Sequence, residues 1–307
     1  MRRVLTILLC GALLSVAAGC ADEQADAPDR RSKVRVVASI FPIADVVRQI
    51  GGDRVEVACM LAGGMSPHDF QPSPQHAEQL AEAQLVVVVG LGVDAWAAPA
   101  AEAAARHARL LTLTEETAND HEEAHDAPAH EHAHHHGGRD PHVWLDPVIM
   151  QEFVRRIADE LSQIDPSHAS AYTARRDAYI VQLCELDALY RQMLADVPRK
   201  QFVTFHTAFT YIAERYGLEQ RSLHTADARG FGPQHLEQVA QFVREHEIRA
   251  IFAEPQFPPD KLQALAEATG ASVGVLDPLG RAGQAGYDSY LAMMRSNLDT
   301  LAAALKD

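Results

Sequence analysis

Positive charge, cysteine and long apolar runs are all scarce in this chain of 307 residues. Lysine and arginine number 27 against 42 aspartates and glutamates, so the formal net charge is −15. This surplus of negative charge argues against a nucleic-acid-binding protein and is compatible with cationic ligands. The length and the 47% content of hydrophobic residues are sufficient for two globular domains.

The apolar run nearest the N-terminus is too short to span a membrane, and it belongs to an export signal. Two arginines precede the apolar stretch at residues 4–14, and small residues follow it up to Cys20. We predict a signal peptide at residues 1–20. The letters AAGC resemble a lipobox, which makes Cys20 the predicted lipidated residue, and ordinary cleavage near Ala18 is the alternative. Residues 21–33 are then a flexible tether.

Only four cysteines occur, and two of them fall in the signal region. Cys59 and Cys184 have apolar neighbours in the sequence, which favours two buried free thiols over a disulfide. An oxidising compartment outside the cytoplasm would still permit a bridge between them.

Strand-like and helix-like segments alternate from residue 34 onwards. In the first half the strand-like runs are VRVVASI, VEVACML, LVVVVG and RLLTL, with helical stretches at residues 43–50, 75–83 and 94–107 between them. The run at residues 85–89 is apolar throughout, as in a strand buried on both faces. In the second half, each helical stretch follows a strand-like run, and these runs are FVTFH, IRAIFAEP and ASVGVLD. The alternation predicts an α/β fold of two lobes, each with a mostly parallel sheet flanked by helices.

A segment without proline or glycine separates the two halves. Asp165-Pro166 is a good helix start, and neither proline nor glycine recurs until Pro198. Helical spacing puts six apolar residues on one face: Tyr172, Tyr179, Leu183, Leu186, Tyr190 and Met193. About thirty residues form a rod of roughly 45 Å, which can hold two lobes at a fixed angle. We therefore predict lobes at 34–164 and 198–307 joined by one long rigid helix at 165–197, with a surface helix of one domain as the alternative.

Histidine dominates a loop predicted at residues 115–140. Seven of the sixteen residues at 121–136 are histidine, and Arg139 is the only cationic residue of the loop against eight carboxylates. Neutral imidazole is the commonest protein ligand for zinc, copper and nickel. We predict accessory, low-affinity metal binding by His121, His125, His130, His132, His134, His135 and His136. A solvated polar loop is the alternative.

The letters HEEAH at residues 121–125 match the HExxH pattern of zinc proteases. That pattern requires a helix with one buried face, on which Glu122 would act as general base. Apart from proline, no apolar residue larger than alanine lies between Leu113 and Val143, so such a helix would have nothing to bury. We predict that the chain is not an enzyme; a metalloprotease is the alternative, and it would require hydrolysis that depends on Glu122.

Three other histidines and one aspartate lie where strands of the predicted fold end in loops. His68 lies in GGMSPHDFQPSP, His142 in DPHVWLDP just before a helix, His206 at the end of FVTFH, and Asp277 at the end of ASVGVLD. Ligands of α/β proteins bind beyond the carboxyl ends of the strands. Three imidazoles and one carboxylate form a tetrahedral zinc set in type and number. Taken singly, each of the four is also explained as a surface histidine or a turn-forming aspartate.

The chain resembles the solute-binding proteins of zinc and manganese ABC importers. Five stretches carry the resemblance by their order and context: SPHDFQPSP, DPHVWLDP, FVTFHTAFTYIAERYG, IFAEPQF and LDPLG. The resemblance covers essentially the whole mature chain and points to the zinc type (ZnuA/AdcA-like, cluster A-I, periplasmic solute-binding protein family 9). It implies two lobes joined by one rigid helix, with metal in the cleft between them. It also implies that His68 and His142 come from the first lobe and His206 and Asp277 from the second.

The residue at the third ligand position, His206, indicates which metal is bound. Manganese-type relatives tend to have glutamate where this chain has His206, and imidazole in place of carboxylate favours zinc. A His-rich insertion before the second histidine ligand is typical of the zinc type. The fourth ligand is open between Asp277, a water molecule and another carboxylate. The resemblance also implies that Glu254, in AEPQF, lies near the cleft, where it could orient a ligand histidine; a carboxylate of a helix start or loop is the alternative.

These features predict a high-affinity extracytoplasmic protein that binds one Zn²⁺ tightly and further ions weakly in the His-rich loop. It would deliver zinc to the membrane permease of an ABC importer, as a monomer, either in the periplasm or attached to the membrane through a lipid on Cys20. A manganese-binding member of the same transport class is the first alternative. A surface adhesin or a metal store without transport is the second.

Overall fold

The computed structural model describes residues 33–61, 63–104, 108–114, 139–223, 233–257 and 259–306. The predicted signal peptide, the tether up to residue 32 and the His-rich loop up to residue 138 lie outside these ranges, and with them Cys20, Glu122 and all seven tract histidines. In the part of the chain that the structure describes, no helix is both long and apolar enough to cross a membrane.

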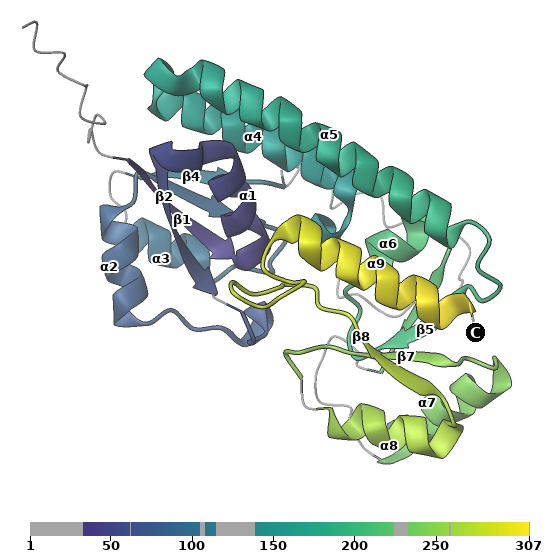
Figure 1. The fold of residues 1–307 in the computed structure, drawn as a ribbon. Coiled ribbons are helices and arrows are strands. Elements are labelled where there is room, and N and C mark those ends of the chain that lie inside the picture. The colour runs from purple at the N-terminus through teal and green to yellow at the C-terminus, as the bar shows by residue number, and fades with distance from the viewer. Residues whose placement is uncertain are drawn as a thin grey trace, which may run out of the picture. The chain divides into compact units, whose positions relative to one another are not determined.

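The first half of the chain forms a four-stranded parallel sheet with the strand order β2–β1–β3–β4 (Figure 1). Its elements are β1 (Val34–Ile40), α1 (Phe41–Gly51), β2 (Val55–Leu61), α2 (Pro74–Glu82), β3 (Leu85–Val88), α3 (Ala97–Ala104) and β4 (Arg109–Thr112). Valine and isoleucine dominate β1 and β3, where branched side chains pack well on a pleated surface. All four residues of β3 are buried, which confirms the predicted strand buried on both faces. We call this sheet, with α1–α3, the first lobe.

The second half forms another four-stranded parallel sheet, with the order β6–β5–β7–β8. Its elements are β5 (Gln201–Thr204), α6 (Thr210–Arg215), β6 (Glu219–Ser222), α7 (Pro233–Glu245), β7 (Ala250–Ala253), α8 (Asp260–Thr269) and β8 (Ser272–Val275). β6 has no counterpart among the predicted strands, because its sequence EQRS is polar and half-buried at the sheet edge. We call this sheet, with α6–α8, the second lobe. The two parallel sheets confirm the predicted fold class.

Two long helices lie side by side along the first lobe, and one of them continues over the second lobe (Figure 1). They are α4 (Pro147–Ile164) and α5 (Ala169–Leu194). A 3₁₀ turn at Pro166–His168 precedes α5, whose 26 residues make a rod of roughly 39 Å. The predicted apolar face is buried except for Met193, which is half-buried while Leu194 is buried instead.

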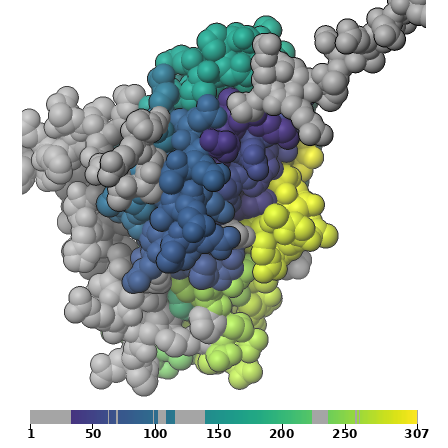
Figure 2. Space-filling view, turned by 90° about the vertical axis from the view of Figure 1, so that its left-hand side faces the viewer, coloured from purple at the N-terminus to yellow at the C-terminus, as the bar shows by residue number. Residues whose placement is uncertain are grey.

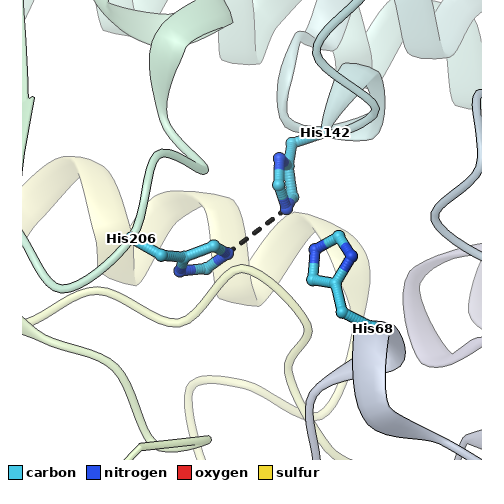
Figure 3. A group of neighbouring side chains, drawn as sticks. All are labelled: His68, His142 and His206. Atoms are coloured by element: carbon cyan, nitrogen blue, oxygen red, sulfur yellow. Dashed lines mark hydrogen bonds between the residues drawn. The ribbon is translucent and has the colours of Figure 1, made fainter. Parts of the chain in front are cut away.

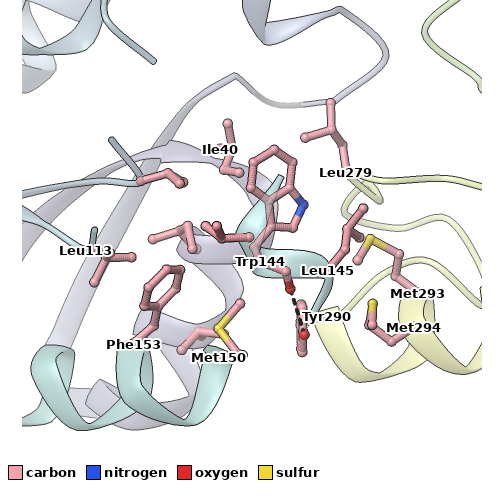
Figure 4. Close-up of a cluster of buried hydrophobic side chains, with 14 of the residues drawn as sticks. Ile40, Leu113, Trp144, Leu145, Met150, Phe153, Leu279, Tyr290, Met293 and Met294 are labelled. Atoms are coloured by element: carbon pink, nitrogen blue, oxygen red, sulfur yellow. Dashed lines mark hydrogen bonds between the residues drawn. The ribbon is translucent and has the colours of Figure 1, made fainter. Parts of the chain in front are cut away.

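One hydrophobic core runs through both lobes and beneath α4, α5 and the C-terminal helix α9 (Tyr290–Lys306). Trp144 is fully buried in it, among side chains from the first lobe, α4 and α9 (Figure 4). Its indole Nε1 donates a hydrogen bond of 2.7 Å to the carbonyl of Pro278, and its own carbonyl accepts one of 2.8 Å from the Tyr290 hydroxyl. Trp144 thus ties the segment before α4 to the segment before α9.

Alternate residues of the second sheet face two different cores. Phe202 and Phe252 pack into the core shared with the first lobe. Val203 and Ile251, one position along each strand, pack into a smaller core with residues of α7 and α8. This alternation is the period-two pattern of a strand buried on both faces.

The described residues from Lys33 onwards form one compact unit. On the face shown in Figure 2, the first lobe (blue) lies between the long helices (teal, top) and the second lobe (green, bottom), with the C-terminal segment (yellow) beside it.

The two cysteines within the described ranges are free. Cys59 is half-buried, and burial raises the pKa of its thiol to about 12. Cys184 is exposed, so the prediction of a buried thiol is wrong for this residue. Leu183 and Leu186 on either side of it face the core, and Cys184 lies on the other face of α5.

Candidate metal centre

His68, His142 and His206 converge from three separate segments of the chain (Figure 3). One ring nitrogen from each can be chosen so that all three lie within 4.8 Å of one another. The Nε2 atoms of His142 and His206 are 3.3 Å apart, and the ring of His68 lies 5.5 Å and 6.2 Å from theirs, measured between centroids. His142 is buried, His206 half-buried and His68 exposed, so the cluster opens towards solvent at His68.

The loop after β2 positions His68. A 3₁₀ turn at Pro67–Asp69 carries the residue, and the Ser66 side chain accepts a hydrogen bond of 3.2 Å from the backbone N–H of His68. The indole of Trp96 donates to the carbonyl of Pro67 at 2.9 Å. The predicted proline-rich loop is therefore an ordered turn held from the first lobe.

Asp140 orients His142. Its Oδ1 accepts hydrogen bonds from the backbone N–H of His142 at 2.9 Å and from the ring Nδ1 at 2.7 Å. The carboxylate fixes the tautomer with the proton on Nδ1, because it can only accept, and leaves the Nε2 lone pair directed at the other histidines. After a further 3₁₀ turn, Asp146 caps α4 by accepting from the N–H of Val148 at 2.8 Å.

Glu254 lies beside both the backbone and the ring of His206. His206 lies two residues beyond the end of β5, and Glu254 directly follows the neighbouring strand β7. Glu254 Oε1 accepts a hydrogen bond of 2.9 Å from the backbone N–H of His206, and Oε2 lies 2.5 Å from the ring Nδ1. The Glu254 side chain is fully buried. The backbone bond thus places the carboxylate next to the ring, where a small rotation of either side chain would let it accept the ring N–H.

Asp277 is not brought into the histidine cluster: no oxygen of its carboxylate joins the group of ligand atoms within 4.8 Å of one another. Its Oδ1 accepts three hydrogen bonds of 3.0 Å each, from the backbone N–H groups of Leu279 and Gly280 and from Nε2 of Gln256. Asn297 of α9 also bonds both backbone groups of Asp277. The buried carboxylate thus holds the turn that follows β8.

Both lobes line a small pocket next to the cluster, and it is open to solvent. Its walls are formed by Ser66, Pro67, His142, Trp144, His206, Gln256, Phe257, Pro278 and Leu279. Apolar walls lower the local dielectric and strengthen the interaction of a cation with nearby carboxylates. His142 and His206 are the two imidazoles that face this space.

The surroundings favour the neutral, metal-binding form of two of the imidazoles, His68 and His142. Desolvation, followed by the nearby rings of His142 and His206, lowers the pKa of His68 to about 4, although part of its side chain remains accessible to solvent. Desolvation also lowers the pKa of His142, against the opposing effect of Asp140. Burial would raise the pKa of Asp140, but its bonds with His142 outweigh burial and lower it. Neutral imidazoles beside an ionised carboxylate are ready to receive a cation.

Sequence reasoning missed Asp140, although a signal for it was present. The letters DPH place a carboxylate two residues before the histidine, a spacing that lets one side chain bond both the ring and the backbone of His142. Nothing in the sequence indicates the bond between Gln256 and Asp277, because it joins residues 21 positions apart. The predicted accessory histidines at 121–136 and the HEEAH letters lie outside the described residues.

The molecule thus combines two α/β lobes with parallel sheets, a long helix along both, and three imidazoles that together could hold a metal ion. The sequence model of the family described as "zinc-uptake complex component A, periplasmic" matches residues 36–304. The chain therefore belongs to this ZnuA family.

Several relatives illustrate the range of the family. The chain is 31% identical to the zinc-binding protein AdcA of Streptococcus pyogenes over 96% of its own length and 60% of that protein. It is 30% identical to the high-affinity zinc uptake system protein ZnuA of Bacillus subtilis, over 95% and 94% of the two chains. The manganese-binding lipoprotein MntA of Halalkalibacterium halodurans is 26% identical over 99% of both. The chain thus spans about 60% of the length of its AdcA relatives.

The fold is also that of solved structures. The crystal structure of a ZnuA deletion mutant with zinc bound superimposes with a TM-score of 0.78, at 26% identity, covering 90% of this chain and 99% of the other.

Proposed function

We propose that this protein captures Zn²⁺ outside the cytoplasm and delivers it to the permease of an ABC importer. The observation that carries the proposal is the convergence of His68, His142 and His206 from both lobes on one point beside a pocket. The zinc-binding names of the AdcA and ZnuA relatives support the choice of metal.

The distance between two of the imidazoles fits a tetrahedral zinc ion. With zinc–nitrogen bonds of about 2.0–2.1 Å, two ligands of a tetrahedron lie about 3.3 Å apart. The Nε2 atoms of His142 and His206 are separated by that distance. His68, as the exposed member, has the freedom to close on the ion from the solvent side.

The charges near the cluster balance a divalent cation. Imidazole ligands bind zinc in their neutral form and contribute no charge. Asp140 and Glu254 each place a carboxylate at the Nδ1 side of a histidine, away from the Nε2 atoms that face each other. Zinc would therefore be neutralised through its ligands rather than by direct contact with an anion. Water is proposed as the fourth ligand, because Asp277, which the sequence suggests for this place, already accepts three hydrogen bonds at its Oδ1.

The histidines at 121–136 are proposed as weak accessory sites that collect zinc. A lipid on Cys20 would keep the protein at the membrane that holds the permease. Binding a single copy of this chain to the permease would suffice, because the lobes needed for the site come from one chain.

Growth under zinc starvation tests the transport role. Cells that lack the gene should fail to grow when zinc is chelated, and the wild-type gene but not His206→Ala should restore growth. A matched control, His246→Ala, changes an exposed histidine whose ring contacts that of Phe242 outside the cluster and should restore growth fully. If added manganese, and not zinc, relieves the defect, the manganese alternative is correct.

A further inference from the structure

Helix α6 follows His206 in the chain and contacts the segment that carries His142. It begins four residues after His206, and its side chains Tyr211 and Arg215 are one helical turn apart, so they project from the same face. Both reach across to the segment at residues 139–147, which carries His142 from the other side of the cleft.

The two contacts bracket His142. The Tyr211 hydroxyl donates a hydrogen bond of 2.9 Å to the backbone carbonyl of Asp140. Both Nε and Nη2 of Arg215 lie 2.5 Å from Oδ2 of Asp146, whose side chain is 2% exposed. Asp140 and Asp146 are also the residues that hold the segment locally: one bonds the His142 ring and the other caps α4.

The helix has a firm support of its own. The residue that follows it, Tyr216, is buried and donates a hydrogen bond of 3.0 Å from its hydroxyl to Asp187 on α5. A shift of α6 would therefore disturb the long helix as well, so α6 can serve as a fixed reference for the segment that it contacts.

We infer that Tyr211 and Arg215 are positioning residues for zinc, because they hold His142 of one lobe in register with His206 of the other. This inference rests on the proposed zinc site. Tyr211 acts through Asp140: its bond fixes the backbone of the residue whose carboxylate orients the His142 ring. Ligands placed in advance bind a metal more tightly, since no ordering of the segment opposes binding.

The experiment compares two Tyr→Phe variants of the mature chain, each of which loses one hydroxyl-to-carbonyl bond. Tyr211→Phe removes the bond to Asp140. Tyr190→Phe removes a bond of 2.7 Å to the carbonyl of Met294, which joins α5 to α9 away from the histidines. Zinc affinity is measured by competition with a chromophoric chelator, the zinc dissociation rate by a chelator chase, and the stability of the metal-free protein by urea unfolding.

Tyr211→Phe should weaken zinc binding about tenfold, at the lower end of the range for residues that orient metal ligands, mainly through faster dissociation. Tyr190→Phe should leave affinity within about twofold, although it too loses one hydrogen bond from a tyrosine hydroxyl to a backbone carbonyl. Equal zinc affinity in the two variants and the wild type would overturn the inference. A wild-type chain without tight zinc binding would instead overturn the proposed function.

A double-mutant cycle tests whether Tyr211 affects zinc binding through His142. In a His142→Ala background, Tyr211→Phe should have no further effect on the residual zinc affinity, because the ligand through which it acts is gone. A further loss of the same size would contradict positioning through His142. Arg215→Lys, which keeps the charge but loses the forked geometry, gives a second variant in which dissociation should be faster.

Discussion

Glu254 and His206 occupy equivalent places just beyond two neighbouring strands, and the glutamate contacts both the backbone N–H and the ring Nδ1 of the histidine. β5 and β7 pair in parallel with Thr204 opposite Phe252, so the residues two positions further along each strand meet. The register of one strand pair therefore fixes the orientation of one imidazole.

Replacing Glu254 by glutamine should weaken zinc binding by about 10–100-fold, the range measured for such partners of metal ligands. The amide oxygen can still accept the bond from the His206 backbone, so the loss reports the missing charge and the disturbed ring. Glu152→Gln, at a side chain that is 61% exposed on α4, is the control and should leave affinity unchanged. Equal affinities of the two variants in chelator competition would show that Glu254 has no part in binding.

The pH dependence of binding should differ from that of free histidine. Since the pKa of His68 is lowered to about 4, this ligand stays neutral well below the usual range, and protons compete with zinc for it only below about pH 5. NMR titration of the metal-free protein should find the His68 resonance unchanged between about pH 7.5 and 5.5. An inflection near the ordinary value of about 6.5 would refute the prediction.

The same shift affects stability. A histidine whose pKa is lower in the folded than in the unfolded state binds fewer protons when folded, so stability falls as pH drops from about 6.5 towards the folded pKa. The metal-free protein should therefore unfold at lower urea concentration at pH 5 than at pH 7. His68→Gln should reduce that difference.

Trp144→Ala should lower the free energy of unfolding by about 3–5 kcal/mol, because it empties a fully buried site and breaks the bond to Pro278. Val181→Ala, at an apolar residue that is 57% exposed on α5, should change it by no more than about 0.5 kcal/mol. Urea unfolding of both variants checks the prediction, and a loss below about 1 kcal/mol for Trp144→Ala would contradict the role of this residue in joining the segments before α4 and α9.

Much of the first lobe could be predicted from the sequence, because its strands are continuous apolar runs. VRVVASI and VEVACML coincide with β1 and β2 residue for residue. β6 could not be found, since a polar edge strand has no apolar pattern and is specified by its pairing with β5. Periodicity predicts Met193 on the buried face of α5, whereas Leu194 is the buried residue there. The difference lies in the last turn of the helix, where a repeat pattern does not fix which side chain is buried.

The histidines of the cluster could be proposed from their positions after strands and from family resemblance, but their orientation could not. Asp140 and Tyr211 contribute to it through contacts that depend on the fold, and the Tyr211 bond joins residues 71 positions apart. Asp277 shows the opposite case. Its place at the end of β8 suggests a ligand, while its hydrogen bonds are those of a residue that holds a turn.

Deleting residues 120–136 should separate the two predicted kinds of metal site. The weak zinc ions should disappear from a calorimetric titration, because the accessory histidines are gone, while the tight phase should persist. Loss of the tight phase in this variant would mean that the tract supplies ligands to the principal site. Replacing the seven tract histidines by serine, at unchanged loop length, controls for the shortened chain.

A zinc titration of the purified mature chain shows whether three histidines from two lobes hold one zinc ion. We expect one tightly bound zinc per chain in the wild type and in His246→Ala, and no tight phase in His206→Ala. A tight phase that survives in His206→Ala, with unchanged affinity and stoichiometry, would mean that the histidine cluster is not the zinc site.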